Sequence, residues 1–170
     1  MKKALCLAAS LLLAAGAAWM VWHRLHRDER LIEETLRECA EAASFRAGEA
    51  PAGALLKLRR LESRTEPEID VSLRVRGRSF QGKLAQKELI SRLAASRKYL
   101  SSLEIDLGDL NISIAGEKAL AEASVQLRGT GGSGAERWKD SALEDVKFTF
   151  VKREGRWRVA GVTGGDFMER

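Results

Sequence analysis

The chain has 170 residues, of which 45% are hydrophobic and 31% are charged, and its formal net charge is +5. Residues 1–30 carry +3 of that charge, because they hold five Lys or Arg against two Asp or Glu, and acids and bases are mixed along the remainder. A nucleic-acid-binding domain needs a clustered basic face, usually with aromatic residues for stacking, so no nucleic-acid partner is expected.

The first part of the chain predicts a membrane segment. Lys2 and Lys3 precede residues 4–22, which are 19 residues without a charge. A helix of that length spans roughly 28 Å, which is about the thickness of the hydrocarbon core of a bilayer. Trp19 and Trp22 suit the membrane interface at its far end. We therefore expect residues 4–22 to be an uncleaved anchor that binds the protein to a membrane.

The alternative for this segment is a cleaved signal peptide, which also begins with a short basic region and an apolar core. Ala15-Gly16-Ala17 offers a small-x-small cleavage site, although cleavage there would leave an apolar new N-terminus. Basic residues flank both ends of the segment, and the short, export-like N-terminal region favours an extracytoplasmic domain. We expect it on the periplasmic side of the bacterial inner membrane, or secreted if the segment is cleaved.

Three helices are expected after this segment. Residues 29–45 repeat apolar residues at three- and four-residue spacing, as one face of a helix does. A second helix is expected over residues 54–64, and Pro67 is expected to end it, because proline disfavours the helical conformation of the residue before it. Residues 83–101 predict the third helix from the same apolar spacing.

The strands are predicted from apolar residues that recur at every second position. Apolar and polar residues alternate over 71–76, a turn follows, and residues 79–81 form a short return strand that Gly82 breaks. Residues 129–141 read as a loose connection between later strands. Four longer strands carry the same alternation: 103–114, 119–128, 146–150 and 157–159.

This order predicts an α+β domain, in which helices pack on one face of an antiparallel sheet. The folded domain is expected to begin near residue 30. The expected organisation is a membrane anchor or signal segment over 1–22, a juxtamembrane stretch and first helix over 23–53, the remainder of the domain over 54–163, and a frayed tail over 164–170.

Two local patterns carry a family resemblance. The first is Val75-Arg76-Gly77-Arg78-Ser79-Phe80-Gln81-Gly82 running into a helix, and the second is Phe148-x-Phe150 followed by Gly155-Arg156-Trp157-Arg158-Val159. With the order of elements, they resemble the nuclear transport factor 2-like (NTF2-like) superfamily, which includes SnoaL-like and ketosteroid-isomerase-like proteins, over roughly residues 30–162. The resemblance implies a cone of three helices on a strongly curved antiparallel sheet, often around a pocket.

The domain offers little for catalysis. The two histidines, His23 and His26, precede it, and Tyr99 is the only tyrosine. A serine nucleophile needs a base, normally histidine, and the His, Cys and carboxylate residues lack metal-site spacing. Residues 129–134 match G-x-G-x-x-G, but a dinucleotide site requires a helix after this loop and a strand is expected instead. We expect no catalytic residue, cofactor or metal ion.

Two sets of residues are candidates for binding. If the cone is hollow, the expected lining comprises Leu73, Val75, Tyr99, Phe148, Phe150 and Trp157. Contacts to a second copy or to another protein are expected on the outer sheet face and the adjoining loop, at Arg74, Ser124, Gln126 and Trp138.

Together these features favour a membrane-tethered, non-enzymatic binding or scaffolding module that acts outside the cytoplasm. The alternative is a small-ligand-binding protein or a SnoaL-like enzyme that uses the cone cavity. The enzyme hypothesis predicts one or two ionisable groups inside an apolar pocket, so the residues that line the cone distinguish the two hypotheses.

Overall fold

The computed structural model describes residues 26–75, 78–131 and 138–167 of the chain. The expected membrane segment, residues 1–22, lies outside these ranges. Within them, no helix combines the length and the hydropathy that crossing a membrane requires. The described residues form the α+β domain that the pattern of elements predicts.

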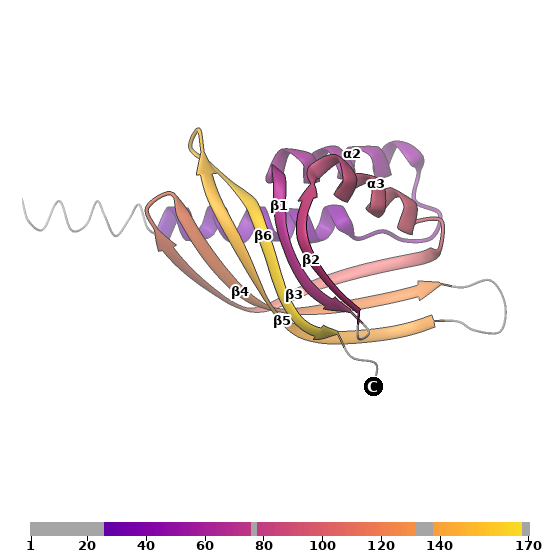
Figure 1. The fold of residues 1–170 in the computed structure, drawn as a ribbon. Coiled ribbons are helices and arrows are strands. Elements are labelled where there is room, and N and C mark those ends of the chain that lie inside the picture. Colours follow the sequence, from indigo (N-terminus) through magenta and orange to yellow (C-terminus); the bar gives the residue numbers. More distant parts are fainter. Residues whose placement is uncertain (1–25, 76–77, 132–137, 168–170) are drawn as a thin grey trace, which may run out of the picture.

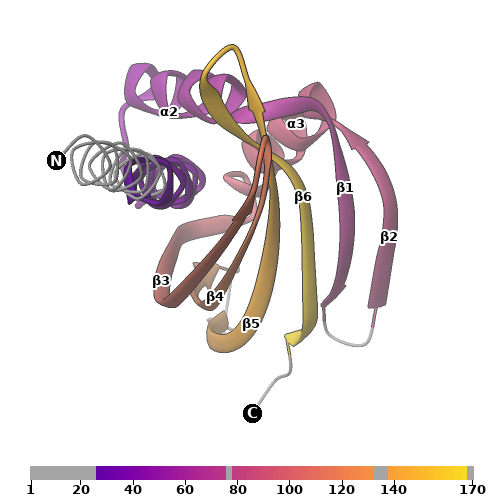
Figure 2. The same cartoon turned by 90° about the vertical axis from the view of Figure 1, so that its left-hand side faces the viewer.

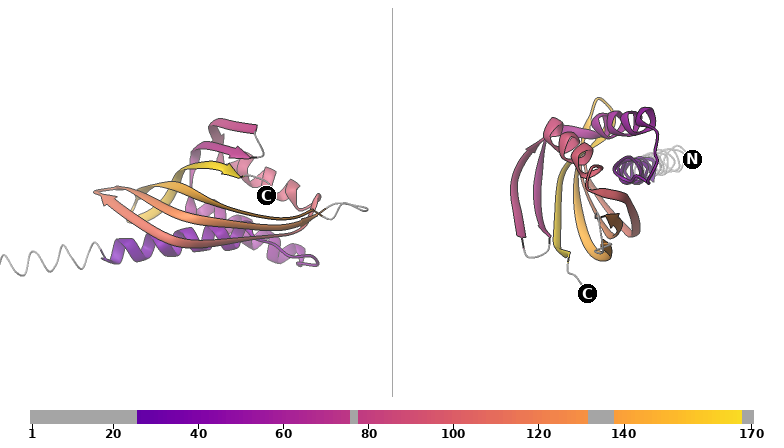
Figure 3. Two further views of the ribbon diagram at one scale, coloured as in Figure 1. Left: turned by 90° about the horizontal axis from the view of Figure 1, so that it is seen from below. Right: turned by 90° about the vertical axis from the view of Figure 1, so that its right-hand side faces the viewer.

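Three helices lie on the concave side of one strongly curved, six-stranded sheet (Figures 1 and 2). The first helix, over residues 26–43, is called the long helix here, and it runs lengthwise along the sheet (Figure 3). The other elements are α2 (Pro51–Arg64), β1 (Thr65–Val75), β2 (Arg78–Ala85), α3 (Gln86–Ser96), β3 (Leu100–Ala115), β4 (Lys118–Gly131), β5 (Trp138–Arg153) and β6 (Arg156–Phe167).

The sheet is mixed, which corrects the expectation of an antiparallel sheet. Its strand order is β2-β1-β6-β5-β4-β3, and β1 pairs with β6 in parallel, whereas the other four pairings are antiparallel. The chain crosses from β2 to the far edge through α3 and then returns as a meander of four strands. Alternation along a sequence identifies a strand but does not identify its neighbour, so the parallel pair could not be predicted.

Several boundaries also differ from the sequence prediction. Pro67 lies inside β1 rather than between a helix and a strand, at a shift in register between Thr65 and Asp70, where the missing proline N–H is tolerated. Gly82 does not break β2, since it pairs with Val71. The hairpin of β4 and β5 is longer than expected, because backbone pairing extends to Gly131 and to the start of β5.

The long helix packs against small side chains on the sheet. Ala119, Ala121 and Ala123 of β4 all face inward and are at most 4% exposed. Their short side chains leave room for Ile32 and Leu36 of the long helix, which are almost completely buried in the same cluster. The period of two in β4 therefore creates the groove into which the apolar stripe of the helix fits.

Polar contacts fix both ends of the long helix. Near its start, Asp28 is 8% exposed, and its carboxylate accepts hydrogen bonds from Lys152 Nζ, at 2.7 and 2.8 Å, and from Trp157 Nε1, at 3.2 Å. Just beyond its end, Phe45 forms two backbone hydrogen bonds with Leu103 of β3, at 2.7 and 2.9 Å. The helix is therefore held to β5 and β6 at one end and to β3 at the other.

Removing the Asp28 carboxylate tests this attachment. We expect Asp28→Ala to lower the free energy of unfolding by about 2–4 kcal/mol, because it leaves the ammonium of Lys152 and the indole N–H of Trp157 without a buried acceptor. The matched control is Glu33→Ala on the same helix, which removes only an exposed ion pair with Arg37 and should cost at most about 0.5 kcal/mol. Denaturant unfolding measures both, and equal losses would contradict a special role for Asp28.

Candidate functional site

A cavity of about 420 Å³ lies between the helices and the concave face of the sheet. Its size falls in the range of roughly 300–1,000 Å³ that small-molecule pockets in proteins occupy. All three helices contribute to its wall, for example through Leu36, Leu61 and Leu93, and so do the strands, for example through Val71 and Val125. The cone that the sequence resemblance implies is therefore hollow in part.

The cavity occupies one end of the cone because the long helix changes character along its length. Ile32, in its first half, fills the space over the sheet together with Phe150 and Trp157, and Leu36 lies where this filled part meets the cavity wall. Its second half presents Ala40 and Ala43 toward the cavity, together with Cys39. Small side chains at that end leave unfilled space beneath the helix.

Apart from Arg92, the polar groups in the described part of the wall are few and already engaged or inert. Thr65 Oγ1 donates a hydrogen bond to the Leu61 carbonyl, at 2.9 Å, and accepts one from Gln86 Nε2, at 2.9 Å. Burial raises the pKa of the Cys39 thiol to about 12, so the thiol stays protonated at neutral pH and is a poor nucleophile. Of the described side chains in the wall, none is a carboxylate or an imidazole that could act as a general base.

The structure distributes the expected cavity residues over three places. Leu73 and Phe148 lie in the cavity wall. Phe150 and Trp157 face inward, as expected, but are 0% and 1% exposed and pack in the filled part of the cone. Tyr99 lies outside the cavity and is 77% exposed, because it precedes β3 in the turn after α3.

One expected lining residue is Val75, whose side chain lies outside the described part. Trp138, an expected partner contact, begins β5 rather than lying in a loose loop, and its side chain is likewise not described.

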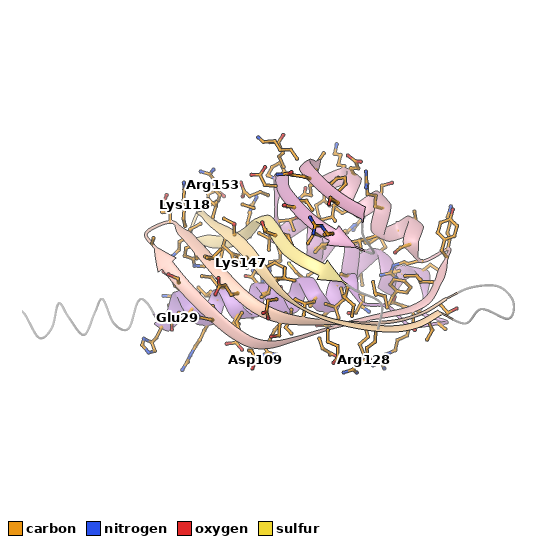
Figure 4. All side chains as sticks on the ribbon, turned by 60° about the horizontal axis from the view of Figure 1, so that its bottom comes forward. Glu29, Asp109, Lys118, Arg128, Lys147 and Arg153 are labelled. Carbon is orange, nitrogen blue, oxygen red and sulfur yellow. The ribbon has the colours of Figure 1, made fainter. Side chains whose placement is uncertain are left out.

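The outer face of the sheet is largely polar, and several of its charges pair across neighbouring strands. Lys147 lies 2.6 Å from Glu122, and Arg128 lies 3.0 Å from Asp106, each pair joining neighbouring strands. Lys147 and Arg128 project from this face in Figure 4. These pairs are exposed to solvent and contribute little stability.

The other expected contacts lie on this outer face. Ser124 Oγ donates toward Asp109 and Asp145, at 3.4 and 3.3 Å, and Gln126 accepts a hydrogen bond from Arg128. Arg74 is exposed on β1 and donates to Ser79 Oγ at 3.4 Å. Ser124 and Gln126 are half-buried on β4, and Arg74 is exposed on β1.

Most residues of the wall were not identified from the sequence, and two of them, Phe80 and Arg92, stand out. Phe80 and Arg92 both line the cavity and are both exposed to solvent. Arg92 interrupts the apolar stripe of α3 between Leu89 and Leu93, which is the signal that could have identified it. Phe80 was noted only as part of a family pattern.

Other chemistries find no support in the described residues. Within these ranges, no group of three or more His, Cys, Asp or Glu side chains is arranged to hold a metal ion. The G-x-G-x-x-G string begins inside β4, where Gly129 and Gly131 pair with β5, and the next described residue, Trp138, begins β5. The first part of the string therefore belongs to a hairpin rather than to a phosphate-binding loop.

No protein-family model and no curated protein sequence matches the chain, whereas solved structures do match it. The Kfla4162 protein from Kribbella flavida has a TM-score of 0.68 at 16% identity, covering 82% of this chain and 90% of that chain. A protein from Streptomyces avermitilis, provisionally assigned as a dehydratase of the NTF2-like family, has a TM-score of 0.63 at 12% identity, covering 85% and 99%. A protein from Caulobacter vibrioides with a cystatin-like fold has a TM-score of 0.58 at 15% identity, covering 80% and 87%.

These likenesses confirm the fold that the sequence resemblance implies. The domain has the NTF2-like, cystatin-like arrangement of three helices on a curved sheet. At identities this low, the likeness shows the fold alone, and the activity assigned to a structural neighbour does not transfer with it.

The reactivity of Cys39 tests whether burial raises the pKa of its thiol. In a Cys6→Ser chain, we expect the rate of alkylation by iodoacetamide to rise about tenfold per pH unit from pH 7 to pH 10 without levelling off. The reason is that a thiol with a pKa of about 12 is still almost fully protonated throughout this range. When the same chain is unfolded in guanidinium, the rate of alkylation should stop rising near pH 9. A similar plateau in the folded chain would contradict the raised pKa.

Proposed function

We propose that this protein is a membrane-tethered, non-enzymatic binding module whose cone holds a small apolar ligand outside the cytoplasm. The observation that carries the proposal is the cavity of about 420 Å³ with an almost wholly aliphatic and aromatic wall. Such a wall stabilises a ligand mainly by removing apolar surface from water. The cavity therefore favours ligand binding over a purely scaffolding role.

An enzyme that uses the same cavity is the less favoured reading. A dehydratase, which is the activity provisionally assigned to the Streptomyces avermitilis protein, needs groups that remove and deliver protons. In the described part of the wall, the hydroxyl of Thr65 is engaged in two hydrogen bonds, and the Cys39 thiol stays protonated because burial raises its pKa. Neither group is suited to proton transfer at neutral pH.

A photoreactive ligand tests the binding proposal. The full chain in a nonionic detergent is irradiated with a long-chain fatty alcohol that carries a diazirine, and labelled peptides are identified by mass spectrometry. We expect labels on peptides of the cavity wall, and Ala43→Leu, which fills part of the cavity, should weaken this labelling at least about tenfold. Labelling of residues 4–22 serves as the internal reference for probe taken up by the micelle.

The matched control is Ala94→Leu, the same substitution at an exposed position of α3 that does not line the cavity. It should change cavity labelling by less than about twofold. A probe that labels only residues 4–22, or that labels both variants equally, would contradict binding in the cone.

The tether is supported by the uncharged stretch of 19 residues, which ends four residues before the described start of the long helix. So short a connection would keep the domain beside the lipid surface. We place it at the bacterial inner membrane, on the periplasmic side, with secretion after cleavage as the alternative.

Cell fractionation tests the tether. In a bacterial host we expect the full chain to stay in the membrane fraction after an alkaline carbonate wash, and the domain to be digested when protease is added to spheroplasts. A chain that lacks residues 4–22 should leave the membrane fraction. Recovery of the intact, uncleaved chain from the cytosol would rule out both the anchor and the signal peptide.

Contact with a second copy through the outer sheet face is part of the proposal. On the outer side of β4, Leu120 is 38% exposed, and Ser124 and Gln126 follow on the same face. An exposed leucine among polar groups is compatible with a modest, reversible contact between sheets.

Engineered cysteines test this contact. In a Cys6→Ser background, Gln126→Cys should form a disulfide-linked dimer under mild oxidation, because the two outer faces would meet near β4. Lys87→Cys, at an exposed position on α3, is the control and should remain monomeric. Dimers from both variants, or from neither, would contradict a specific contact through the sheet.

A further inference from the structure

The mouth of the cavity is marked by two side chains. Every other described residue of the wall is buried or half-buried, whereas Phe80 of β2 is 38% exposed and the side chain of Arg92 on α3 is 57% exposed. The two side chains contact each other, since the guanidinium carbon of Arg92 lies 5.3 Å from the centre of the Phe80 ring. The cavity therefore meets solvent between β2 and α3.

Arg92 is also the one charged residue among the described side chains of the wall. The rest of the wall is apolar apart from Thr65 and Cys39, which offer no charge at neutral pH. A cation at the rim of an apolar cavity suits a ligand with two different parts. The apolar part is removed from water inside, and an anionic part remains at the mouth.

The guanidinium is held in position but remains available to a ligand. It lies over the Phe80 ring, and a ring face holds a guanidinium in a defined place by cation–π attraction. Its ion pair with Glu88, at 2.6 Å, joins positions i and i+4 of α3, and both side chains are about half exposed. Pairs of this kind are weak because water screens them, so a ligand carboxylate can replace Glu88 at little cost.

From this arrangement we propose that the ligand is an amphipathic carboxylic acid of the fatty-acid type. Its hydrocarbon chain occupies the cavity, and Arg92 binds its carboxylate at the mouth. A guanidinium matches a carboxylate with two parallel N–H···O hydrogen bonds, which no other described group of the wall provides. This inference rests on the proposed binding function and specifies the chemical class of the ligand.

The test compares two diazirine probes of equal chain length, a fatty acid and the corresponding fatty alcohol, on the full chain in nonionic detergent. In the unmodified protein, we expect half-maximal labelling of the cavity wall at an acid concentration about fivefold below that of the alcohol. Arg92→Gln should make the two probes equal by weakening the acid alone, and Arg92→Lys should restore part of the difference. Glu88→Gln should favour the acid further, because it removes the competing carboxylate.

The matched control is Lys87→Gln, which removes an exposed cation from the same helix without touching the cavity. It should leave the preference for the acid intact. If Lys87→Gln and Arg92→Gln weaken the acid equally, general surface charge explains the preference and the inference is overturned. If acid and alcohol label the cavity equally in the unmodified protein, the inference is overturned while the binding function stands. If neither probe labels the cavity, the binding function is overturned and this inference with it.

Discussion

The attachment of the long helix across the concave face of the sheet is the constraint on which the rest of the domain depends. Asp28 fixes its start to β5 and β6, and the backbone of Phe45 fixes the chain just beyond its end to β3. Between these points, Ile32 and Leu36 lie in the groove over β4. Because both ends are held, the helix cannot collapse onto the sheet where its side chains become small, and a cavity remains beneath its second half.

The chemistry of the site follows from this packing. Each helix and strand buries one apolar face, so any space that these elements enclose has an apolar wall. The fold itself does not supply a catalytic group. Among the described residues of the wall, the one charge lies at its edge, at Arg92, whose side chain is exposed to solvent and lies over the Phe80 ring. A pocket of this kind discriminates between ligands mainly by what they carry at the mouth, since the interior accepts apolar groups of many shapes.

The sequence predicted the elements better than it predicted their arrangement. Alternation over residues 119–128 predicted a strand, and the apolar set of that alternation, which includes Ala121 and Ala123, is the set that the structure buries, because period and burial are directly related in a strand. The same alternation could not separate Phe148, in the cavity wall, from Phe150, in the packed part, because that difference depends on where the long helix lies. Arg92 was not identified for a similar reason. It interrupts the apolar stripe of α3, but a charge on a helix is usually solvated, and its place beside a cavity depends on the tertiary structure.

The parallel pairing of β1 with β6 has a consequence for how the protein is made. β1 is the first strand of the domain and β6 is the last described one, so Val71 lies beside Val162 only after every element between them has been synthesised. Contacts so distant in sequence form late and slowly. Among the described strands, β6 is the last in the sequence, so a polypeptide that ends before β6 lacks Val159 and Val162 of the cavity wall and leaves β1 without its parallel neighbour.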